Sequence, residues 1–178
     1  MATSVKKTTA RKTAAKEATR SSSSPDATAM LRADHKKVSA LFTQFESTRS
    51  VAKKKQIVAT VCAKLTVHAQ IEEEIFYPAV KAALRDKELV PEATIEHATL
   101  KDLIAQLQGA EPDGEMYDAK VKVMSEYVKH HVKEEQNEMF PRAKASRLDL
   151  VALGEQMAKR KAELMSGEGQ SASPASLG

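Results

Sequence analysis

The sequence predicts an all-α fold: an antiparallel up-down-up-down four-helix bundle with a short C-terminal helix and disordered tails. The first observation is composition, because Ala, Lys, Glu, Leu and Val dominate the 178 residues while aromatic residues make up only 4%. These abundant residues favour helix over sheet. The second observation is spacing, because apolar residues recur at alternating steps of three and four, as on the packed faces of helices. Short breaks between such segments favour antiparallel neighbours.

Five helices are expected, at about residues 26–48, 51–84, 91–108, 113–145 and 148–164. The first carries an inward apolar stripe that begins at Leu31 and ends at Phe45. The second carries a stripe that begins at Val61 and continues to Ala79. Proline lacks a backbone N–H, so we expect Pro78 to kink or end this helix locally.

The remaining three helices are delimited by proline, glycine and the apolar pattern. Pro91 stands in the first turn of the third helix and Gly109 follows its end, the usual positions of these residues. The fourth helix has a stripe that begins at Tyr117, and we expect Pro141 to disturb it as Pro78 disturbs the second. The short fifth helix begins near Leu148.

The two ends of the chain are predicted to be disordered tails, at residues 1–25 and 166–178, around a folded body at 26–165. Both lack the large apolar residues needed to offset the entropy of ordering. The first tail is basic, with six Lys or Arg and one Glu in residues 1–24, although the whole chain has a net charge of only +4. Such a tail could contact DNA phosphates without sequence specificity, or it could serve solubility alone.

Cysteine content and hydropathy predict a cytoplasmic protein without a membrane partner. The single cysteine, Cys62, cannot form an intramolecular disulfide, which fits a reducing compartment. No apolar run approaches the roughly 20 residues needed to cross a bilayer. The N-terminus also lacks the apolar segment of a secretory signal.

Histidines fall on the inward stripes of the four long predicted helices, one on each helix: His35, His68, His97 and His131. Glu72 and Glu135 each follow a histidine by one helical turn and therefore share its face. The stretch HAQIEEEIFYP at 68–78 recurs 63 residues later as HVKEEQNEMFP. Two related helical hairpins would therefore bring four imidazoles and two carboxylates into the bundle interior.

A pair of metal ions would account for this polar interior. A buried carboxylate costs several kcal/mol unless it is paired or binds a metal. Imidazole and carboxylate suit Fe, Mn or Zn better than Ca or Mg, and two such ions could each take two imidazoles with both carboxylates bridging. A single inward histidine is more often a hydrogen-bonded core residue, and Glu73 and Glu74 are better read as a solvated face. Four histidines in register with two repeated glutamates favour a metal site over six unrelated core residues.

These segments resemble the hemerythrin family, specifically its HHE cation-binding branch, over about residues 28–160. The resemblance is carried by ADH at 33–35, EH at 96–97 and the two repeated stretches at 68–78 and 131–141. It implies a hemerythrin-like bundle around a non-haem di-iron centre with an oxo or hydroxo bridge.

Ligand roles follow from the resemblance by position. It implies that His35 and His68 serve one iron, that His97 and His131 serve the other, and that Glu72 and Glu135 bridge the two.

The third helix departs from the oxygen-carrying members, which have H-x-x-x-H there. Ala93 and Lys101 stand four residues before and after His97, so one iron lacks an imidazole. The centre could be more symmetrical, could recruit a further carboxylate such as Glu73 or Glu134, or could have two open positions.

The resemblance implies a protein that binds or reacts with dioxygen, peroxide or nitric oxide in sensing or stress defence, with peroxide decomposition as one activity. Alternatives are iron storage without turnover, or association with DNA through the basic tail. Tyr127, one turn before His131, is expected close to the centre together with Glu73 and Glu134, although it could equally be a rim tyrosine. Tyr77 and Phe76 are expected to pack beside the proline turn.

Overall fold

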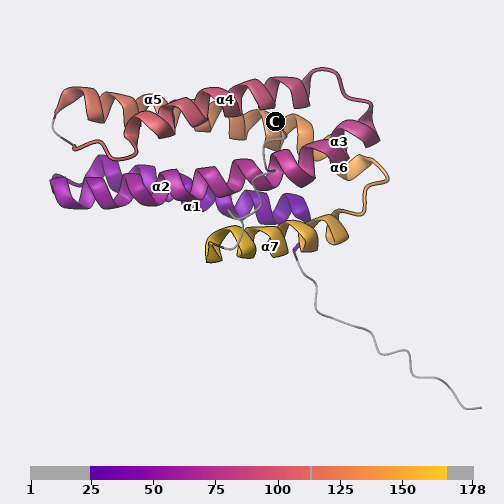
Figure 1. Cartoon of the computed structure of the whole chain (residues 1–178). Coiled ribbons are helices and arrows are strands. Elements are labelled where there is room, and N and C mark those ends of the chain that lie inside the picture. The colour runs from indigo at the N-terminus through magenta and orange to yellow at the C-terminus, as the bar shows by residue number, and fades with distance from the viewer. Residues whose placement is uncertain (1–24, 113, 168–178) are drawn as a thin grey trace, which may run out of the picture.

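The computed structural model describes residues 25–112 and 114–167, which form a helical bundle (Figure 1). The predicted tails lie outside these residues, apart from residues 25, 166 and 167. The helical segments are α1 (Ala27–Ser47), α2 (Val51–Ile71), η1 (Glu72–Phe76), α3 (Tyr77–Leu84), α4 (Leu89–Leu107), α5 (Glu115–Glu134), η2 (Glu135–Met139), α6 (Phe140–Ala145) and α7 (Leu150–Ser166). No strand occurs in the described part, so the predicted all-α class is confirmed.

The bundle consists of α1, α2, α4 and α5, each of which runs antiparallel to the next along the chain (Figure 1). Contacts between α2 and α4 and between α1 and α5 close the arrangement. The short C-terminal helix α7 lies against α1 and α2. Asp26, Ser50 and Asp149 precede α1, α2 and α7, and their side chains accept hydrogen bonds from backbone N–H groups in the first turn.

Both prolines that were expected to kink or end helices are passed by a continuous helical path. A π-helical turn precedes each proline, Glu72–Phe76 before Pro78 and Glu135–Met139 before Pro141. The wider turn lets the N–H of Tyr77 bond to the carbonyl of Glu72, five residues earlier. Local widening therefore accommodates the proline, and it begins at the two glutamates of the repeated stretches. Such π turns occur frequently at functional sites.

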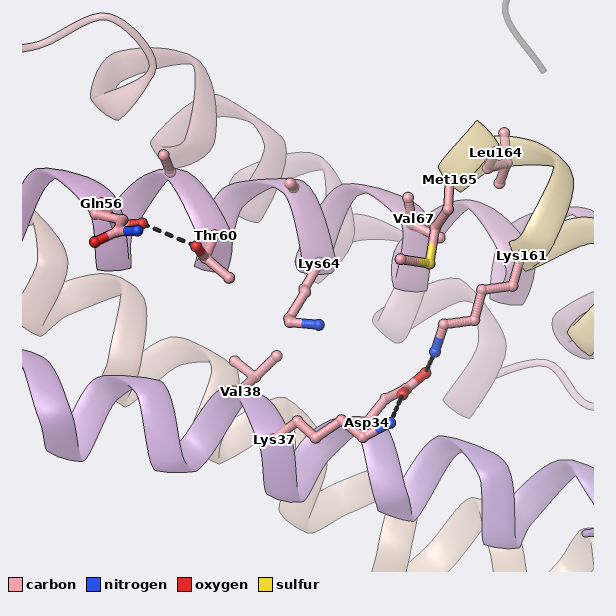
Figure 2. A pocket seen from close by; sticks show the side chains of 12 residues that line it. Asp34, Lys37, Val38, Gln56, Thr60, Lys64, Val67, Lys161, Leu164 and Met165 are labelled. Carbon is pink, nitrogen blue, oxygen red and sulfur yellow. Dashed lines mark hydrogen bonds and ion pairs between the residues drawn. The ribbon is translucent and has the colours of Figure 1, made fainter. Parts of the chain in front are cut away.

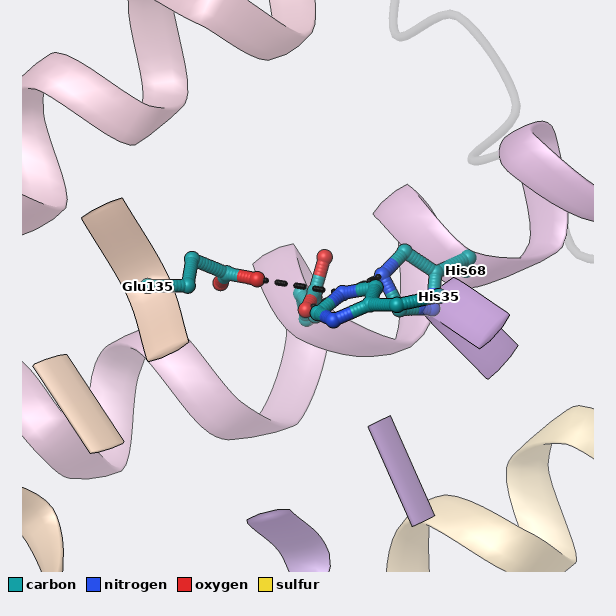
Figure 3. A group of neighbouring side chains, drawn as sticks. His35, His68 and Glu135 are labelled. Atoms are coloured by element: carbon teal, nitrogen blue, oxygen red, sulfur yellow. Dashed lines mark hydrogen bonds and ion pairs between the residues drawn. The ribbon is translucent and has the colours of Figure 1, made fainter. Parts of the chain in front are cut away.

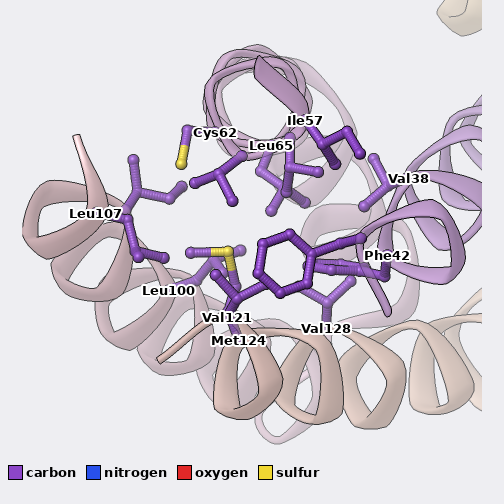
Figure 4. Packing of buried hydrophobic residues seen from close by; sticks show 14 of the residues in the cluster. Val38, Phe42, Ile57, Cys62, Leu65, Leu100, Leu107, Val121, Met124 and Val128 are labelled. Carbon is purple, nitrogen blue, oxygen red and sulfur yellow. The ribbon is translucent and has the colours of Figure 1, made fainter. Parts of the chain in front are cut away.

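Two apolar clusters divide the bundle interior along its length. The larger packs Val38, Leu65, Leu100 and Val128 with further residues of α1, α2, α4 and α5 (Figure 4). The other cluster contains Leu31, Ile71, Phe76, Ala93, Met139, Phe140 and Met157. The four inward histidines lie between the two clusters along their helices. Apolar packing on both sides therefore fixes the depth of this polar layer and keeps bulk water away from it.

Gly154 is the position where α7 meets the start of α1. A Cβ at Gly154 would lie 2.6 Å from the carbonyl oxygen of Pro25 and 2.9 Å from the backbone nitrogen of Ala27. These are backbone atoms that cannot move away cheaply. We expect Gly154→Ala to lower the free energy of unfolding by about 1–2 kcal/mol, because overpacking of this kind costs about 1–3 kcal/mol and the helical preference of alanine offsets part of it. Urea unfolding measures the change, and an unchanged or raised midpoint would contradict the close approach of α7.

Among the described residues, no helix is both long enough and apolar enough to cross a membrane.

Candidate metal centre

The six side chains singled out by the repeat converge at one depth of the bundle. Four helices each supply one histidine, and the glutamates stand at the first positions of the two π turns. All six are buried: His35, His68, Glu72, His97, His131 and Glu135, with relative exposures of 7% or less. Figure 3 shows that His35 and His68 face one another, with Glu135 directed toward them.

The first half of the cluster is the pair His35 and His68. Their Nε2 atoms lie 3.0 Å apart. Oε1 of Glu72 lies 3.3 Å from Nε2 of His68, and Oε2 of Glu135 lies 3.3 Å from Nε2 of His35. Four donor atoms of the types that bind transition metals thus point at one volume.

The second half is the pair His97 and His131, whose Nε2 atoms lie 3.2 Å apart. The other oxygen of Glu72, Oε2, lies 3.4 Å from Nε2 of His97. Oε2 of Glu135 lies 3.7 Å from Nε2 of His131. Each carboxylate therefore reaches both histidine pairs, as a bridging ligand must.

The donor atoms fit a pair of metal ions better than they fit a hydrogen-bonded core. Both oxygens of Glu72 and Oε2 of Glu135 are buried and have no hydrogen-bond partner in the described part of the chain. An unpaired buried carboxylate is costly, and a bound cation removes that cost. Ligands at about 2.1 Å from one ion lie about 3 Å or slightly more from each other, which matches the separations between these atoms.

Electrostatics in the cluster favours positive charge between the carboxylates. Burial lowers the pKa of His68, but the charge of Glu72 and the contact with Asp34 outweigh it and raise the pKa to about 10. Burial also lowers the pKa of His131, but Glu96 and Glu135 outweigh burial and the pKa rises. Burial would raise the pKa of Glu135, yet the neighbouring histidines hold it below its usual range. Protons or metal cations compete for the same positions, so metal binding will release protons.

Each histidine turns its second ring nitrogen, Nδ1, toward a polar partner. Nδ1 of His131 lies 2.6 Å from Glu96, and Nδ1 of His68 lies 3.8 Å from Asp34. Asp34 and Glu96 are the acids that directly precede His35 and His97 in the sequence. The acceptor at Nδ1 of His131 fixes the tautomer that leaves Nε2 free to bind a metal, whereas the longer contact of His68 is not a hydrogen bond.

The remaining two partners directly follow the bridging glutamates. Nδ1 of His97 lies 3.0 Å from Oε1 of Glu73, and Nδ1 of His35 lies 3.0 Å from the amide nitrogen of Gln136. The two halves differ here, because the carboxylate of Glu73 accepts a hydrogen bond from Nδ1 of His97, whereas the amide nitrogen of Gln136 donates one to Nδ1 of His35. The geometry is consistent with the prediction that Glu73 acts close to the centre, although as a partner of His97.

Basic side chains hold three of these four outer partners. Lys101 contacts both oxygens of Glu73 at 2.7 and 2.6 Å, and Arg32 donates to Oε1 of Gln136 at 2.7 Å. Lys161 and Lys37 both pair with Asp34. Asp34, Lys37 and Lys161 line part of an open groove of about 570 Å³ between α1, α2 and the end of α7 (Figure 2).

Tyr77 lies at the centre, not merely beside the proline turn as the sequence led us to expect. Its hydroxyl donates to Oε1 of Glu135 at 3.1 Å and lies 3.2 Å from Nε2 of His97. Burial and the charges of Glu72 and Glu135 raise the pKa of Tyr77 well above its usual value, so the hydroxyl remains a donor. The corresponding residue of the second repeat is Phe140, which stacks on His35 with ring centroids 6.1 Å apart. Only one half of the centre therefore has a hydroxyl.

Removal of this hydroxyl tests its role. Loss of a hydrogen bond to a metal-ligating carboxylate typically weakens metal binding about 10–100-fold, and we expect a loss of that size for Tyr77→Phe. Competition with a chelator of known affinity measures it. Tyr117→Phe is the matched control, because Tyr117 is also buried but packs in the larger apolar cluster. Equal affinities in the two variants would contradict the assignment.

Tyr127 and Glu134 lie further from the six residues. Tyr127 is half-buried on α5, and no hydrogen bond among the described residues links it to the cluster. That Tyr127 acts close to the centre stays a prediction. Glu134 pairs with His130 at 3.1 Å, and the side chain of His130 is 59% exposed.

Comparison with known proteins identifies the family. The family model described as "Hemerythrin HHE cation binding domain" matches residues 26–143, about two thirds of the chain. A crystal structure of a "Hemerythrin HHE cation binding domain-containing protein", the Rv2633c homolog from Mycobacterium kansasii, is similar in fold. Its TM-score is 0.68 at 23% identity, over 80% of this chain and 89% of that chain.

A relative from Nostoc sp. (strain PCC 7120) is described as a "DNA nickase". It is 28% identical over 111 residues, which are 62% of this chain and 31% of the relative. The chain therefore spans less than a third of that protein's length.

Proposed function

Because the chain belongs to the hemerythrin family of HHE cation-binding domains, we propose that it holds two iron ions and binds or reacts with dioxygen, peroxide or nitric oxide. The proposed ligands are those of the cluster: His35 and His68 for one ion, His97 and His131 for the other, and Glu72 and Glu135 between them. The observation that carries this proposal is Glu72, whose two oxygens face different histidine pairs and lack hydrogen-bond partners. Two adjacent irons supply redox chemistry and sites for small ligands.

The size of the neighbouring cavity favours a very small ligand. A cavity of about 10 Å³ touches all four histidines and is otherwise lined largely by apolar side chains, among them Leu65, Leu100 and Val128. A volume of roughly 10–15 Å³ holds about one water-sized molecule. Dioxygen, peroxide and nitric oxide are therefore better matched to this space than an organic substrate.

The surrounding side chains have distinct roles in this proposal. Leu65, Leu100 and Val128 keep bulk water away from the histidines, which strengthens electrostatic interactions inside. The Tyr77 hydroxyl does not line this cavity, but it donates a hydrogen bond to Glu135 and lies 3.2 Å from Nε2 of His97. Phe140 offers no donor at the corresponding place near His35. Tyr77 is thus expected to act on the ligands of the ions and not on a small molecule in the cavity.

Elemental analysis and absorption spectra of aerobically purified protein test the metal assignment. We expect about two irons per chain and charge-transfer bands of bridged ferric ions. Peroxide consumption by the iron-loaded protein then separates a reactive centre from iron storage without turnover. Loading with iron but no reaction with peroxide, dioxygen or nitric oxide would favour storage, and absence of iron after loading would contradict both.

Contact with DNA is a second candidate function. Two observations favour it: the basic residues 1–24, which lie outside the described residues, and the similarity to a DNA nickase from Nostoc. Phosphate contacts of this kind weaken steeply as salt rises. Salt-dependent DNA binding that disappears when residues 1–24 are deleted would support it, and binding that survives the deletion would exclude the tail as its source.

A further inference from the structure

A separate group of metal-ligating side chains lies on the surface beside the buried centre. It consists of Glu96 on α4 and of His130 and Glu134, one turn apart on α5. Nε2 of His130 lies 3.1 Å from Oε1 of Glu134 and 3.6 Å from Oε1 of Glu96. Ligand atoms of all three residues lie within 4.8 Å of one another. The exposed side chain of His130 makes the group accessible to ions from solvent.

Glu96 connects this group to the buried centre. Its side chain is nine-tenths buried, and Oε2 lies 2.6 Å from Nδ1 of His131. The other oxygen, Oε1, makes no hydrogen bond with any described residue and points toward His130. Oε1 is therefore free to bind a cation together with His130 and Glu134.

The charged surroundings of Glu96 differ from those of the three other residues that contact Nδ1 of a histidine. Asp34, Glu73 and Gln136, which contact the other histidines, are each held by a lysine or arginine. Among the described residues, no lysine or arginine pairs with Glu96 or Glu134. Two carboxylates and one imidazole without a basic partner concentrate negative charge at this place. Glu96 thus lacks the basic partner that the other three residues have, and it lies beside two possible cation ligands, His130 and Glu134.

We propose that Glu96, His130 and Glu134 form a third cation site, which takes a divalent transition-metal ion at the surface next to His131. One imidazole and two carboxylates suit Zn²⁺, Mn²⁺ or Fe²⁺ better than Ca²⁺ or Mg²⁺. Three protein ligands leave room for water at the ion, as in open zinc sites. The capture of this ion does not depend on iron being the metal of the buried centre.

Equilibrium dialysis of the full chain against Zn²⁺, followed by elemental analysis, tests the site. The wild type is expected to bind three ions per chain, and His130→Ala and Glu134→Gln are each expected to bind one ion fewer. Glu126→Gln is the matched control, because Glu126 is an exposed glutamate of the same helix that pairs with Lys122. It is expected to retain all three ions. Both His130 and Glu134 lie at the surface, and circular dichroism checks that the variants stay folded.

The outcomes separate this proposal from the proposed function. Two ions in the wild type and in both variants would overturn the surface site while the buried pair stands. One ion in the wild type and none in the variants would support the surface site and contradict the buried pair. Equal losses in Glu126→Gln and Glu134→Gln would overturn the site, because they would reflect general surface charge.

Discussion

Replacement of Glu72 by glutamine is expected to remove both ions from the buried centre, not just one. The two oxygens of Glu72 face different histidine pairs, at 3.3 Å from His68 and 3.4 Å from His97. A glutamine keeps the shape but offers one oxygen ligand and no negative charge. Each ion then has fewer anionic ligands, and each loses the carboxylate that connects it to the other. Elemental analysis after iron loading and desalting measures the result.

A control lies two positions away in the same run of glutamates. Glu74 is partly exposed and pairs with Arg160 at 2.6 Å, away from the histidines. Glu74→Gln is therefore expected to retain both ions. Full iron loading of Glu72→Gln would contradict the bridging assignment.

Metal loss in Glu72→Gln is also expected without loss of the fold. The substitution removes a buried carboxylate that has no hydrogen-bond partner, so the metal-free variant should unfold at a temperature no lower than that of the metal-free wild type. Thermal unfolding of both metal-free proteins distinguishes a lost ligand from a damaged core. A much lower midpoint for the variant would indicate that Glu72 has a structural partner.

Helical periodicity predicted the bundle and its inward histidines because the six side chains stand on regular stripes. His35, His68, His97 and His131 lie where apolar neighbours of the same stripe are buried, so their depth followed from spacing alone. The family resemblance added what spacing does not contain, namely the expected pairing of the histidines and the expectation of iron. The structure places His35 beside His68 and His97 beside His131.

Tyr77 was missed because the helix changes its period just before it. In a regular α-helix, a residue five positions after Glu72 points about 140° away from it, since each residue turns about 100°. The π turn at Glu72–Phe76 adds a residue to the turn and brings Tyr77 back over Glu72. The only sequence signal was the proline that follows, Pro78, and proline alone does not predict a π turn.

Two of the Nδ1 partners have a signal in the sequence, an acid directly before a histidine. Asp34 and Glu96 each precede a histidine, and they contact not that histidine but the one on the following helix, His68 and His131. Neighbours in sequence diverge by about 100° around a helix, so an acid next to an inward histidine faces the adjacent helix. That adjacency is set by packing between helices, which a single helical stripe does not reveal.

Removal of metal is expected to lower the unfolding temperature of the wild type by at least roughly 10 °C. One ion at about 1,000 times its dissociation constant adds about 4 kcal/mol of stability, and each kcal/mol shifts the midpoint of a chain of this size by about 2–4 °C, so the loss of a single ion accounts for about 10 °C and the loss of two for more. The physical reason is that both oxygens of Glu72 and Oε2 of Glu135 are buried without a hydrogen-bond partner in the described part of the chain. Removal of the ions takes away the positive charge that these oxygens face. Differential scanning calorimetry of loaded and chelated protein measures the shift.

Glu72→Gln provides the control for this second effect, because a variant that binds no ions at the buried centre should lose almost none of its stability on chelation. A shift of the same size in the variant would mean that the chelator acts elsewhere, for example at Glu96, His130 and Glu134. Chelation of His130→Ala separates that contribution, since His130 is exposed and its loss leaves the buried ligands in place. If the wild type lost its ions with no change in midpoint, protonated histidines and not metal would have to stabilise the two buried carboxylates, and the metal would contribute nothing to the fold.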